Sequence, residues 1–363
     1  MTPPSSAERP LAEAAKVSPP GAAAPSGRVT IAQIARTAGV SVPTVSKVLN
    51  GRTGVSPATR QYIRQLLEEH GYEPRVARRP TGSGLVEFVI RDLDSLYATA
   101  LLRGAEREAA RSGASVVVTV THGRPVGDRD WIEHLAARRS DGVVLVVSRI
   151  GQAAKDALAR LHLPLVIVDP VGNTAVAAPT VAATNWAGGL AAVDHLLELG
   201  HRRIGVITGP MDLVSSQDRL DGYRTGLTRA GIEVDDDLIR YGDFEEAGEY
   251  QGAARLAAEL LQLPDRPTAV VAGSDQQACG VYQAARERGL DVPRDLSVVG
   301  FDDVPLCRWV TPTLTTVRQP LPEMAREATR MVLEMARSGE SATPRVELAT
   351  ELVVRESTAP PAA

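Results

Sequence analysis

The chain has 363 residues, 44% of them hydrophobic, which is enough for two or three folded domains with large cores. Its two cysteines form no CxxC pair and no Cys/His cluster, so a disulfide framework and a structural zinc site are excluded. No apolar run reaches the roughly 20 residues that a membrane-spanning helix needs, and the net charge of −4 taken alone argues against a nucleic-acid partner.

That charge is unevenly distributed along the chain. Residues 28–79 contain nine basic and three acidic residues, a net charge of +6, whereas residues 80–363 carry −10. A basic module joined to an acidic body is typical of a protein whose head binds a polyanion.

The sequence of the first 84 residues predicts a tail, a small helical domain and a linker. Residues 1–27 are rich in Pro, Ala and Ser and lack the apolar core of a signal peptide, so we expect a disordered tail and a cytoplasmic protein. Three short helices are expected within a domain at 28–73. Residues 74–84 are rich in breakers and arginine, which predicts a linker.

The first two helices show the pattern of a helix-turn-helix. Thr30 and Gln33 fit a capping box that begins one helix, and Gly39 ends it. Ser41 can cap the second helix, which would enter the major groove of DNA N-terminus first. The apolar residues expected to face inward on this helix are Val45, Val48 and Leu49. A plain helical hairpin is the alternative.

From residue 85 onward, short Val/Ile-rich runs alternate with amphipathic stretches. The expected strands are 85–90, 115–121, 142–147, 165–169, 203–208, 268–272 and 296–300. The expected helices include 98–112, 186–199, 219–230, 250–261 and 276–288. This alternation predicts two doubly wound α/β subdomains with parallel sheets, whose ligand would bind at the carboxyl ends of the strands.

The whole chain except the tail resembles the lactose-repressor (LacI/GalR) family of bacterial regulators. The motifs that carry the resemblance in the head are Thr30-Ile31, Ala35, Gly39-Val40-Ser41, Thr44-Val45-Ser46, Lys47, Val48-Leu49-Asn50, Gly54-Val55-Ser56, Thr59-Arg60 and Gly71-Tyr72. In the body they are residues 194–204, 219–223, 273–276, 299–303 and 314–319.

The resemblance implies a helix-turn-helix domain followed by a periplasmic-binding-protein-like core at 85–357. The N-terminal subdomain would comprise about 85–184 and 320–341, and the C-terminal subdomain about 185–319 and 342–357. Residues 358–363 would form a terminal tail. A homodimer would read a near-palindromic operator and release it when a small mono- or oligosaccharide closes the cleft between the subdomains.

The resemblance also assigns the residues that contact DNA. Val42, Pro43 and Lys47 occupy base-facing positions, where Lys47 could donate to guanine. The residues expected to contact phosphates or to position the helix are Thr30, Ser41, Thr44, Ser46, Asn50, Ser56 and Tyr72. For Ser46 and Asn50, capping or packing is an equal alternative.

The linker departs from the family pattern, in which a hinge helix inserts a leucine into the minor groove. Pro80 stands where that leucine is expected, and proline disfavours a helix there. Arg75, Arg78 and Arg79 could instead reach phosphates or a narrow minor groove. A solvated basic linker is the alternative.

Effector contacts are expected at the ends of strands in the core. Arg219 and Asp302 match the family's effector-binding arginine and aspartate. Further candidates are Asp94, Ser95, Tyr97, Asp169, Ser274, Asp275 and Gln319, with Trp186 and Phe244 as stacking rings. Asp303 fits a structural cap better than a ligand contact.

No catalytic motif is present, and neither a metal nor a cofactor is expected. The competing hypotheses are a sugar-binding transport receptor, which would need a secretory signal, and a family member that uses a corepressor. The sequence identifies neither the effector nor the operator.

Overall fold

The structure is a computed structural model, and it describes residues 31–49, 55–69, 83–122, 129–146, 152–171, 178–244, 249–339 and 345–362. These residues form two compact units, one on either side of the segment 70–82. The expected tail and most of the expected linker, Pro80 included, lie outside the described residues.

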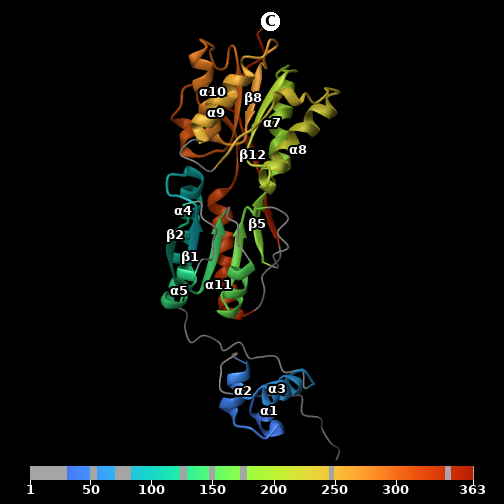
Figure 1. Ribbon diagram of the computed structural model, residues 1–363. Helices are drawn as coiled ribbons and strands as arrows, with labels where there is room; N and C mark the ends of the chain where they lie inside the picture. Colours follow the sequence, from blue (N-terminus) through green and yellow to red (C-terminus); the bar gives the residue numbers. More distant parts are fainter. Residues whose placement is uncertain are drawn as a thin grey trace, which may run out of the picture. The chain divides into compact units, whose positions relative to one another are not determined.

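The first unit is a three-helix domain, as the sequence predicts (Figure 1). Its helices are α1 (Ile31–Ala38), α2 (Val42–Leu49) and α3 (Pro57–Glu69). Ile34 of α1, Val45 of α2 and Ile63 of α3 are almost fully buried against one another. Burial of these side chains holds the helices together, since each helix is too short to be stable alone.

The second unit alternates strands and helices along most of its length. The strands are β1 (Leu85–Ile90), β2 (Ser115–Val120), β3 (Gly142–Val146), β4 (Leu165–Val168), β5 (Thr180–Ala183), β6 (Ile204–Thr208), β7 (Ile239–Tyr241), β8 (Ala269–Ala272), β9 (Ser297–Asp302), β10 (Thr315–Arg318), β11 (Arg345–Leu348) and β12 (Glu351–Val353). The helices are α4 (Leu96–Arg111), α5 (Arg129–Arg138), α6 (Gln152–Arg160), α7 (Asn185–Glu198), α8 (Val214–Arg229), α9 (Glu249–Leu260), α10 (Asp275–Glu287) and α11 (Leu321–Ser338), with 3-10 turns η1 (Asp236–Leu238) and η2 (Pro305–Arg308).

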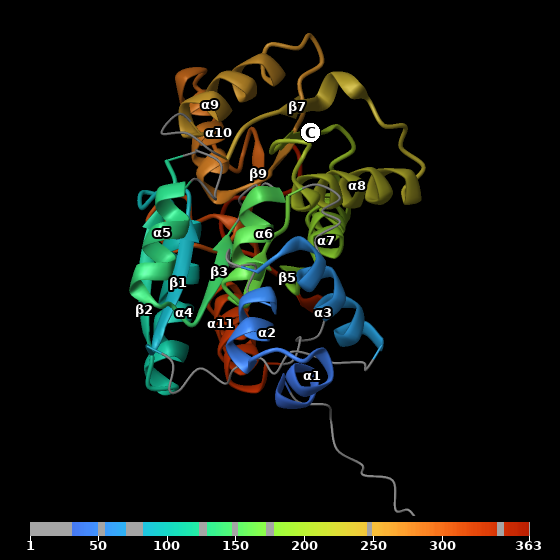
Figure 2. The same ribbon diagram turned by 60° about the horizontal axis from the view of Figure 1, so that its bottom comes forward.

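The strands form two sheets, each covered by helices on both faces. The first sheet has the order β11-β5-β4-β3-β1-β2 and is parallel throughout. Val86 and Phe88 of β1 face α4 and α11, whereas Val89 faces α5 and α6, because successive side chains alternate across a strand. Figure 2 shows α5 and α6 in front of this sheet.

The second sheet has the order β12-β10-β9-β8-β6-β7 and is parallel except for β12. Val270 of β8 packs on the side of α9 and α10, and its neighbour Val271 packs on the side of α7 and α8. The two sheets confirm the predicted pair of doubly wound parallel-sheet subdomains.

The chain crosses between the sheets at three points, which are Thr184, Gln319–Pro320 and Ala349–Thr350. The expected return to the C-terminal subdomain at residue 342 is wrong, because β11 pairs with β5 of the first sheet.

The expected terminal tail at 358–363 also needs correction, because its first residues are held by the core. The amide nitrogen of Ala359 donates to Ser297 Oγ at 3.0 Å, and the Ala359 carbonyl lies 2.9 Å from Nε2 of the buried His201. Nε2 of His195 lies 2.9 Å from Thr358 Oγ1. These contacts make both histidines structural, and burial lowers the pKa of each.

Candidate functional site

The turn between α1 and α2 has the geometry that the sequence predicts. Gly39 has a φ of +65°, a conformation that glycine adopts without a steric penalty. The amide of Val40 donates to the Ala35 carbonyl at 3.0 Å and closes the end of α1. Ser41 then begins α2, since its Oγ accepts from the amide of Thr44 at 3.4 Å.

The side chains expected to face DNA bases lie on the outside of α2. Val42 is 46% exposed, and Pro43 and Lys47 are also exposed, whereas Val45 and Val48 are buried. The face of α2 that carries Val42, Pro43 and Lys47 therefore does not pack into the core of the domain. The predicted base contacts stay predictions.

The hydroxyls expected to reach phosphates take part in helix starts. Ser41 Oγ lies 2.8 Å from Thr44 Oγ1, and Ser56 Oγ lies 2.7 Å from Thr59 Oγ1. Ser46 is half-buried. The remaining predicted DNA contacts, Thr30, Asn50, Tyr72, Arg75, Arg78 and Arg79, lie outside the described residues.

A cavity lies between the two sheets of the second unit. Its lining residues from the N-terminal subdomain are Ile90, Arg91, Asp92, Ser95, Tyr97, Ala98, Val146 and Asp169, and those from the C-terminal subdomain are Leu213, Ser215, Arg219, Phe244, Ser274, Gln276 and Asp302. Many follow the carboxyl ends of parallel strands, where α/β sheets bind ligands. The cavity combines apolar walls with a few charged groups, as small-molecule sites do.

Arg219 is held rigidly on one side of the cavity. Its Nη1 donates to the Gly273 carbonyl at 2.5 Å, and its Nε donates to Asn185 Oδ1 at 2.8 Å. Its guanidinium lies 3.8 Å from the ring centre of Phe301, and the ring of Phe244 lies on the cavity wall 5.8 Å away. A fixed guanidinium of this kind can donate to a ligand oxygen in one orientation.

Two buried carboxylates, Asp169 and Asp302, line the same cavity as Arg219. Asp302 Oδ1 lies 3.9 Å from Arg219 Nη1 and accepts a hydrogen bond from Gln319 Nε2 at 2.6 Å. The Tyr97 hydroxyl donates to Asp169 Oδ2, whereas the buried Oδ1 of Asp169 accepts no hydrogen bond from any described residue.

Burial raises the pKa of both carboxyls, because it disfavours the charged form, and the nearby Arg219 offsets part of that rise. Burial and the neighbouring Asp169 raise the pKa of the Tyr97 hydroxyl as well. An uncharged ligand with several hydroxyl groups would supply the donors that these carboxylates lack.

Seven of the eleven predicted effector residues line the cavity. Ser95 and Ser274 each also cap a helix, because Ser95 Oγ accepts from the Ala98 amide at 3.2 Å and Ser274 Oγ accepts from the Gln277 amide at 3.1 Å. The residues of the predicted set that line it are Ser95, Tyr97, Asp169, Phe244 and Ser274, together with Arg219 and Asp302 themselves.

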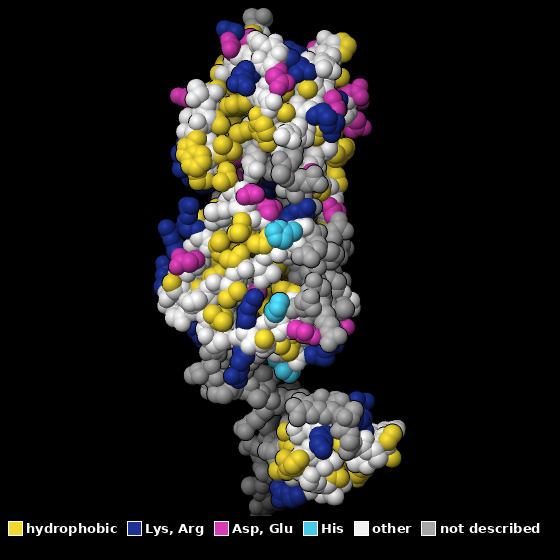
Figure 3. All heavy atoms as spheres, turned by 60° about the vertical axis from the view of Figure 1, so that its left-hand side comes forward, with side chains coloured by type: hydrophobic (Ala, Val, Ile, Leu, Met, Phe, Trp, Pro, Cys, Tyr) yellow, Lys and Arg dark blue, Asp and Glu magenta, His cyan; other side chains and the backbone are white. Residues whose placement is uncertain are grey.

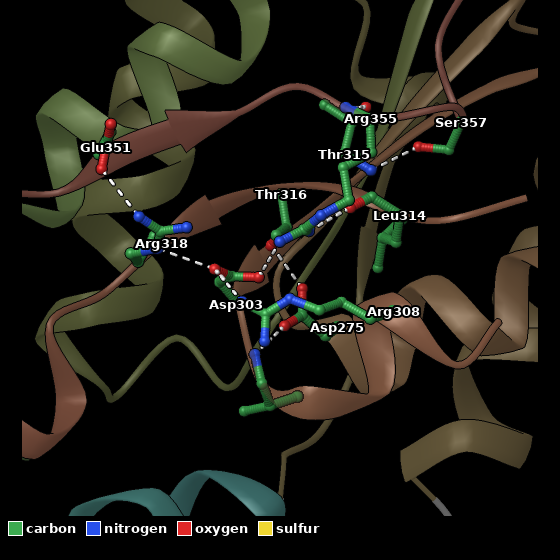
Figure 4. Close-up of polar contacts among 11 residues, drawn as sticks. Asp275, Asp303, Arg308, Leu314, Thr315, Thr316, Arg318, Glu351, Arg355 and Ser357 are labelled. Carbon is green, nitrogen blue, oxygen red and sulfur yellow. Dashed lines mark hydrogen bonds and ion pairs between the residues drawn. The ribbon is translucent and has the colours of Figure 1, made fainter.

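Two predicted contacts are buried behind the cavity wall instead. Asp275 accepts from the Val304 amide at 2.9 Å and from Thr316 Oγ1 at 2.5 Å, so its carboxylate fastens η2 and β10 together (Figure 4). Burial raises its pKa. Gln319 is buried as well, and its amide positions Asp302.

Two other predicted contacts lie away from the cavity. Asp94 lines a separate groove beside α10. Trp186 is 40% exposed, and its ring lies near Arg229. Asn185 points inward at the start of α7. Trp186 is the next residue, about 100° further round the helix, and therefore points outward.

The sequence reasoning missed Asn185 and Phe301, which position Arg219, and the wall residues Arg91, Asp92, Ser215 and Gln276. Helical spacing could have found Ser215, because it precedes Arg219 by one turn of α8. Phe301 shares a sheet face with Val299, an alternation that the sequence shows.

The described residues contain no group of three His, Cys, Asp or Glu side chains that could hold a metal ion. Among the same residues, no helix is long and apolar enough to cross a membrane.

Comparison with known proteins shows which family has this architecture. Residues 30–75 match the bacterial regulatory proteins of the lacI family, and residues 193–358 match the periplasmic binding protein-like domain. The chain is 37% identical over 342 residues to the HTH-type transcriptional regulator MalR of Streptomyces coelicolor, covering 91% of this chain and 96% of that protein. It is 33% identical over 332 residues to the HTH-type transcriptional repressor CytR of Escherichia coli, covering 91% and 96%.

Solved structures agree with this placement. The complex of the transcriptional regulator CelR with cellobiose is 32% identical and covers 91% of this chain and 100% of that chain, with a TM-score of 0.68. The lac repressor dimer bound to operator and the anti-inducer ONPF is 28% identical and covers 92% and 100%, with a TM-score of 0.66. The chain therefore belongs to the lacI family of bacterial transcriptional regulators.

Proposed function

We propose that the chain is a transcriptional repressor that binds operator DNA as a homodimer and releases it when a small neutral sugar occupies the cavity. The observation that carries the proposal is the cavity that is lined by Arg219, two buried carboxylates and the ring of Phe244. Cellobiose is the ligand of the CelR complex, so it is the first sugar to test.

The chemistry of the cavity favours a neutral polyol over a phosphorylated or acidic sugar. Asp169 and Asp302 are both buried, with Arg219 as the nearby cation that lowers the pKa of each. The phosphate or carboxylate group of a charged sugar would lie close to these two carboxylates, and the protein interior screens the repulsion between them poorly. Hydroxyl groups can instead donate to the carboxylates while an apolar sugar face packs on the Phe244 ring.

The first unit supplies the DNA-binding function in this proposal. Its exposed α2 face carries Val42 and Lys47, and the surrounding segment 28–79 has a net charge of +6. Phosphate contacts would provide most of the affinity and make it fall steeply with salt, whereas α2 would read bases.

A groove beside α10 on the second unit, lined by apolar and polar side chains, supports a dimer. Leu96, Leu306 and Val310 line it, and Trp309 and Leu93 nearby are 70% and 61% exposed. Figure 3 shows hydrophobic side chains gathered on this side of both subdomains. Exposed apolar surface of this kind is typical of a protein–protein interface, and the lac repressor neighbour is itself a dimer on its operator.

The experiment that tests the proposal measures sugar binding and operator binding on the same variants. Arg219→Met should weaken cellobiose binding in calorimetry by about 10- to 100-fold, because charge-assisted hydrogen bonds are lost. Arg224→Met is the matched control, since Arg224 lies on the same helix and pairs at the surface with Asp221. Equal losses in both variants would refute the assigned cavity.

Operator binding distinguishes the two ways in which a regulator can use its ligand. Fluorescence anisotropy on a duplex that the wild-type protein selects from a random library should show weaker binding when cellobiose is added. Stronger binding would make the sugar a corepressor and would contradict the proposed induction.

A further inference from the structure

The arginine of the cavity is bonded to a residue at the first crossing between the sheets. Asn185 Oδ1 accepts from Arg219 Nε at 2.8 Å, and Asn185 Nδ2 donates to the carbonyl of Ala183 at 3.1 Å. Ala183 is the last residue of β5 in the first sheet, whereas Arg219 belongs to α8 on the second. One buried amide side chain therefore joins the cavity to both subdomains.

The aspartate of the cavity is bonded in the same way to the second crossing. Gln319 Nε2 donates to Asp302 Oδ1 at 2.6 Å, and the Gln319 amide nitrogen donates to the Asp302 carbonyl at 3.3 Å. The Gln319 carbonyl accepts from the amide of Leu321 at 2.8 Å, where α11 of the first subdomain begins. Gln319 thus links the end of β9 to the start of α11.

The third crossing is bonded to the other two. The Thr350 amide donates to Thr184 Oγ1 at 3.0 Å, and Thr350 Oγ1 donates to the Thr184 carbonyl at 3.2 Å. Next to them, Arg318 joins Asp303 to Glu351 at N–O distances of 2.8 and 3.1 Å (Figure 4). Asp303 directly follows the cavity aspartate, so a bonded path runs from Asp302 to all three crossings.

The backbone at the cavity end of this path is unusual. Asp302 and Asp303 are consecutive, and both have positive φ values, of 119° and 56°. Non-glycine residues occupy this region only when their surroundings hold them there. The contacts from Gln319 to Asp302 and from three arginines to Asp303 provide that restraint.

We propose that Asn185 and Gln319 are positioning residues that relay occupancy of the cavity to the three crossings. A ligand hydroxyl that donates to Asp302 shares this carboxylate with Gln319, and a ligand oxygen bound to Arg219 shares the guanidinium with Asn185, so occupancy of the cavity alters both hydrogen bonds. The ligand thereby favours one arrangement of the crossings over another, which is the differential interaction that a conformational change needs. The relay rests on the proposed function for its ligand.

Hydrogen exchange measured by mass spectrometry tests the relay. The backbone amides to follow are ones that make no hydrogen bond to the substituted side chains. The Thr184 amide donates to the Leu348 carbonyl and the Thr350 amide to Thr184 Oγ1, so both report on the crossings. The variants are Gln319→Met, which removes the donor at similar volume, and Asn185→Asp, which keeps the acceptor for Arg219 and loses the donor to Ala183.

Gln277→Met is the matched control for these variants. Gln277 is equally buried, and its amide bonds Thr208, Asp243 and Gly273 near the cavity but away from the crossings. In the ligand-free full chain, Gln319→Met and Asn185→Asp should speed exchange at Thr350 by about tenfold, the effect of one lost hydrogen bond. Gln277→Met should leave it unchanged.

Experiments with added cellobiose distinguish a failure of the relay from a failure of the proposed function. In the wild type, cellobiose should change exchange at Thr184 and Thr350, and in Gln319→Met this response should be lost. If calorimetry shows no cellobiose binding to the wild type, the assigned sugar is wrong, and the ligand-free comparison alone decides the relay. Exchange that changes only at residue 319, or equally in Gln277→Met, overturns it.

Discussion

Gly189 of α7 packs against the backbone of Arg219, the cavity arginine on α8. A Cβ added at Gly189 would lie 2.3 Å from the carbonyl oxygen of Arg219 and 3.0 Å from its Cα. Both are backbone atoms, so no side-chain rotation can relieve the clash. Gly189→Ala must therefore push the two helices apart.

The size of the effect follows from the distances. Restoring an ordinary contact needs a displacement of about 1 Å, and overpacking of this kind costs about 1–3 kcal/mol of unfolding free energy. The same displacement stretches the 2.8 Å bond from Arg219 Nε to Asn185 beyond hydrogen-bond range. We expect cellobiose affinity to fall about tenfold as well, since Arg219 loses its fixed position.

Urea unfolding followed by fluorescence, with calorimetric titration of cellobiose, measures both effects. Gly252→Ala is the matched control, because a Cβ at this glycine of α9 meets no atom within 4 Å. That variant should gain about 0.5–1 kcal/mol, the ordinary benefit of alanine over glycine in a helix. If Gly189→Ala is as stable as Gly252→Ala and binds the sugar normally, the close approach of α7 and α8 is refuted.

Three further predictions concern pH, DNA and assembly. Because burial raises the pKa of Asp302, this carboxyl keeps its proton to a higher pH in the folded chain than in the unfolded chain. The free energy of unfolding should therefore fall as the pH rises from about 4 through the raised pKa. Asp302→Asn should make this fall shallower in urea titrations at several pH values, and an unchanged slope would contradict the raised pKa. Lys47→Ala should cost about 1–3 kcal/mol of operator binding and relax base preference at one position in anisotropy assays, whereas a uniform loss across all sequences would assign Lys47 to phosphate. Trp309→Glu should shift the dimer toward monomer in analytical ultracentrifugation, and an unchanged mass would place the interface elsewhere.

Strands buried on both faces are the part of the fold that the sequence predicts best. The apolar run 85–90 coincides with β1, and 142–147 with β3, because an uninterrupted Val/Ile/Leu run has few alternatives to a parallel strand. β11 was missed, since its Arg345 and Glu347 alternate with apolar residues and the strand lies at the edge of its sheet. Because β11 pairs with β5 of the first sheet, the last subdomain boundary lies beyond residue 348.

The candidate site was predictable from strand ends and from the family motifs. Asp169 could be named because it ends an expected strand, whereas Arg219, which lies inside α8, and Asp302 were named from the family resemblance. Trp186 was misplaced because its direction depends on the rotation of α7, which packing sets. Asn185 was missed for a related reason, since its role is visible only once Arg219 is placed beside it.

Operator binding of the wild-type chain with and without sugar is the direct test of sugar-induced release from DNA. In anisotropy titrations on the selected duplex, cellobiose should weaken binding of the wild type and have a much smaller effect on Arg219→Met. Wild-type operator affinity that is the same at every cellobiose concentration, although calorimetry shows the sugar bound, would contradict the proposed induction.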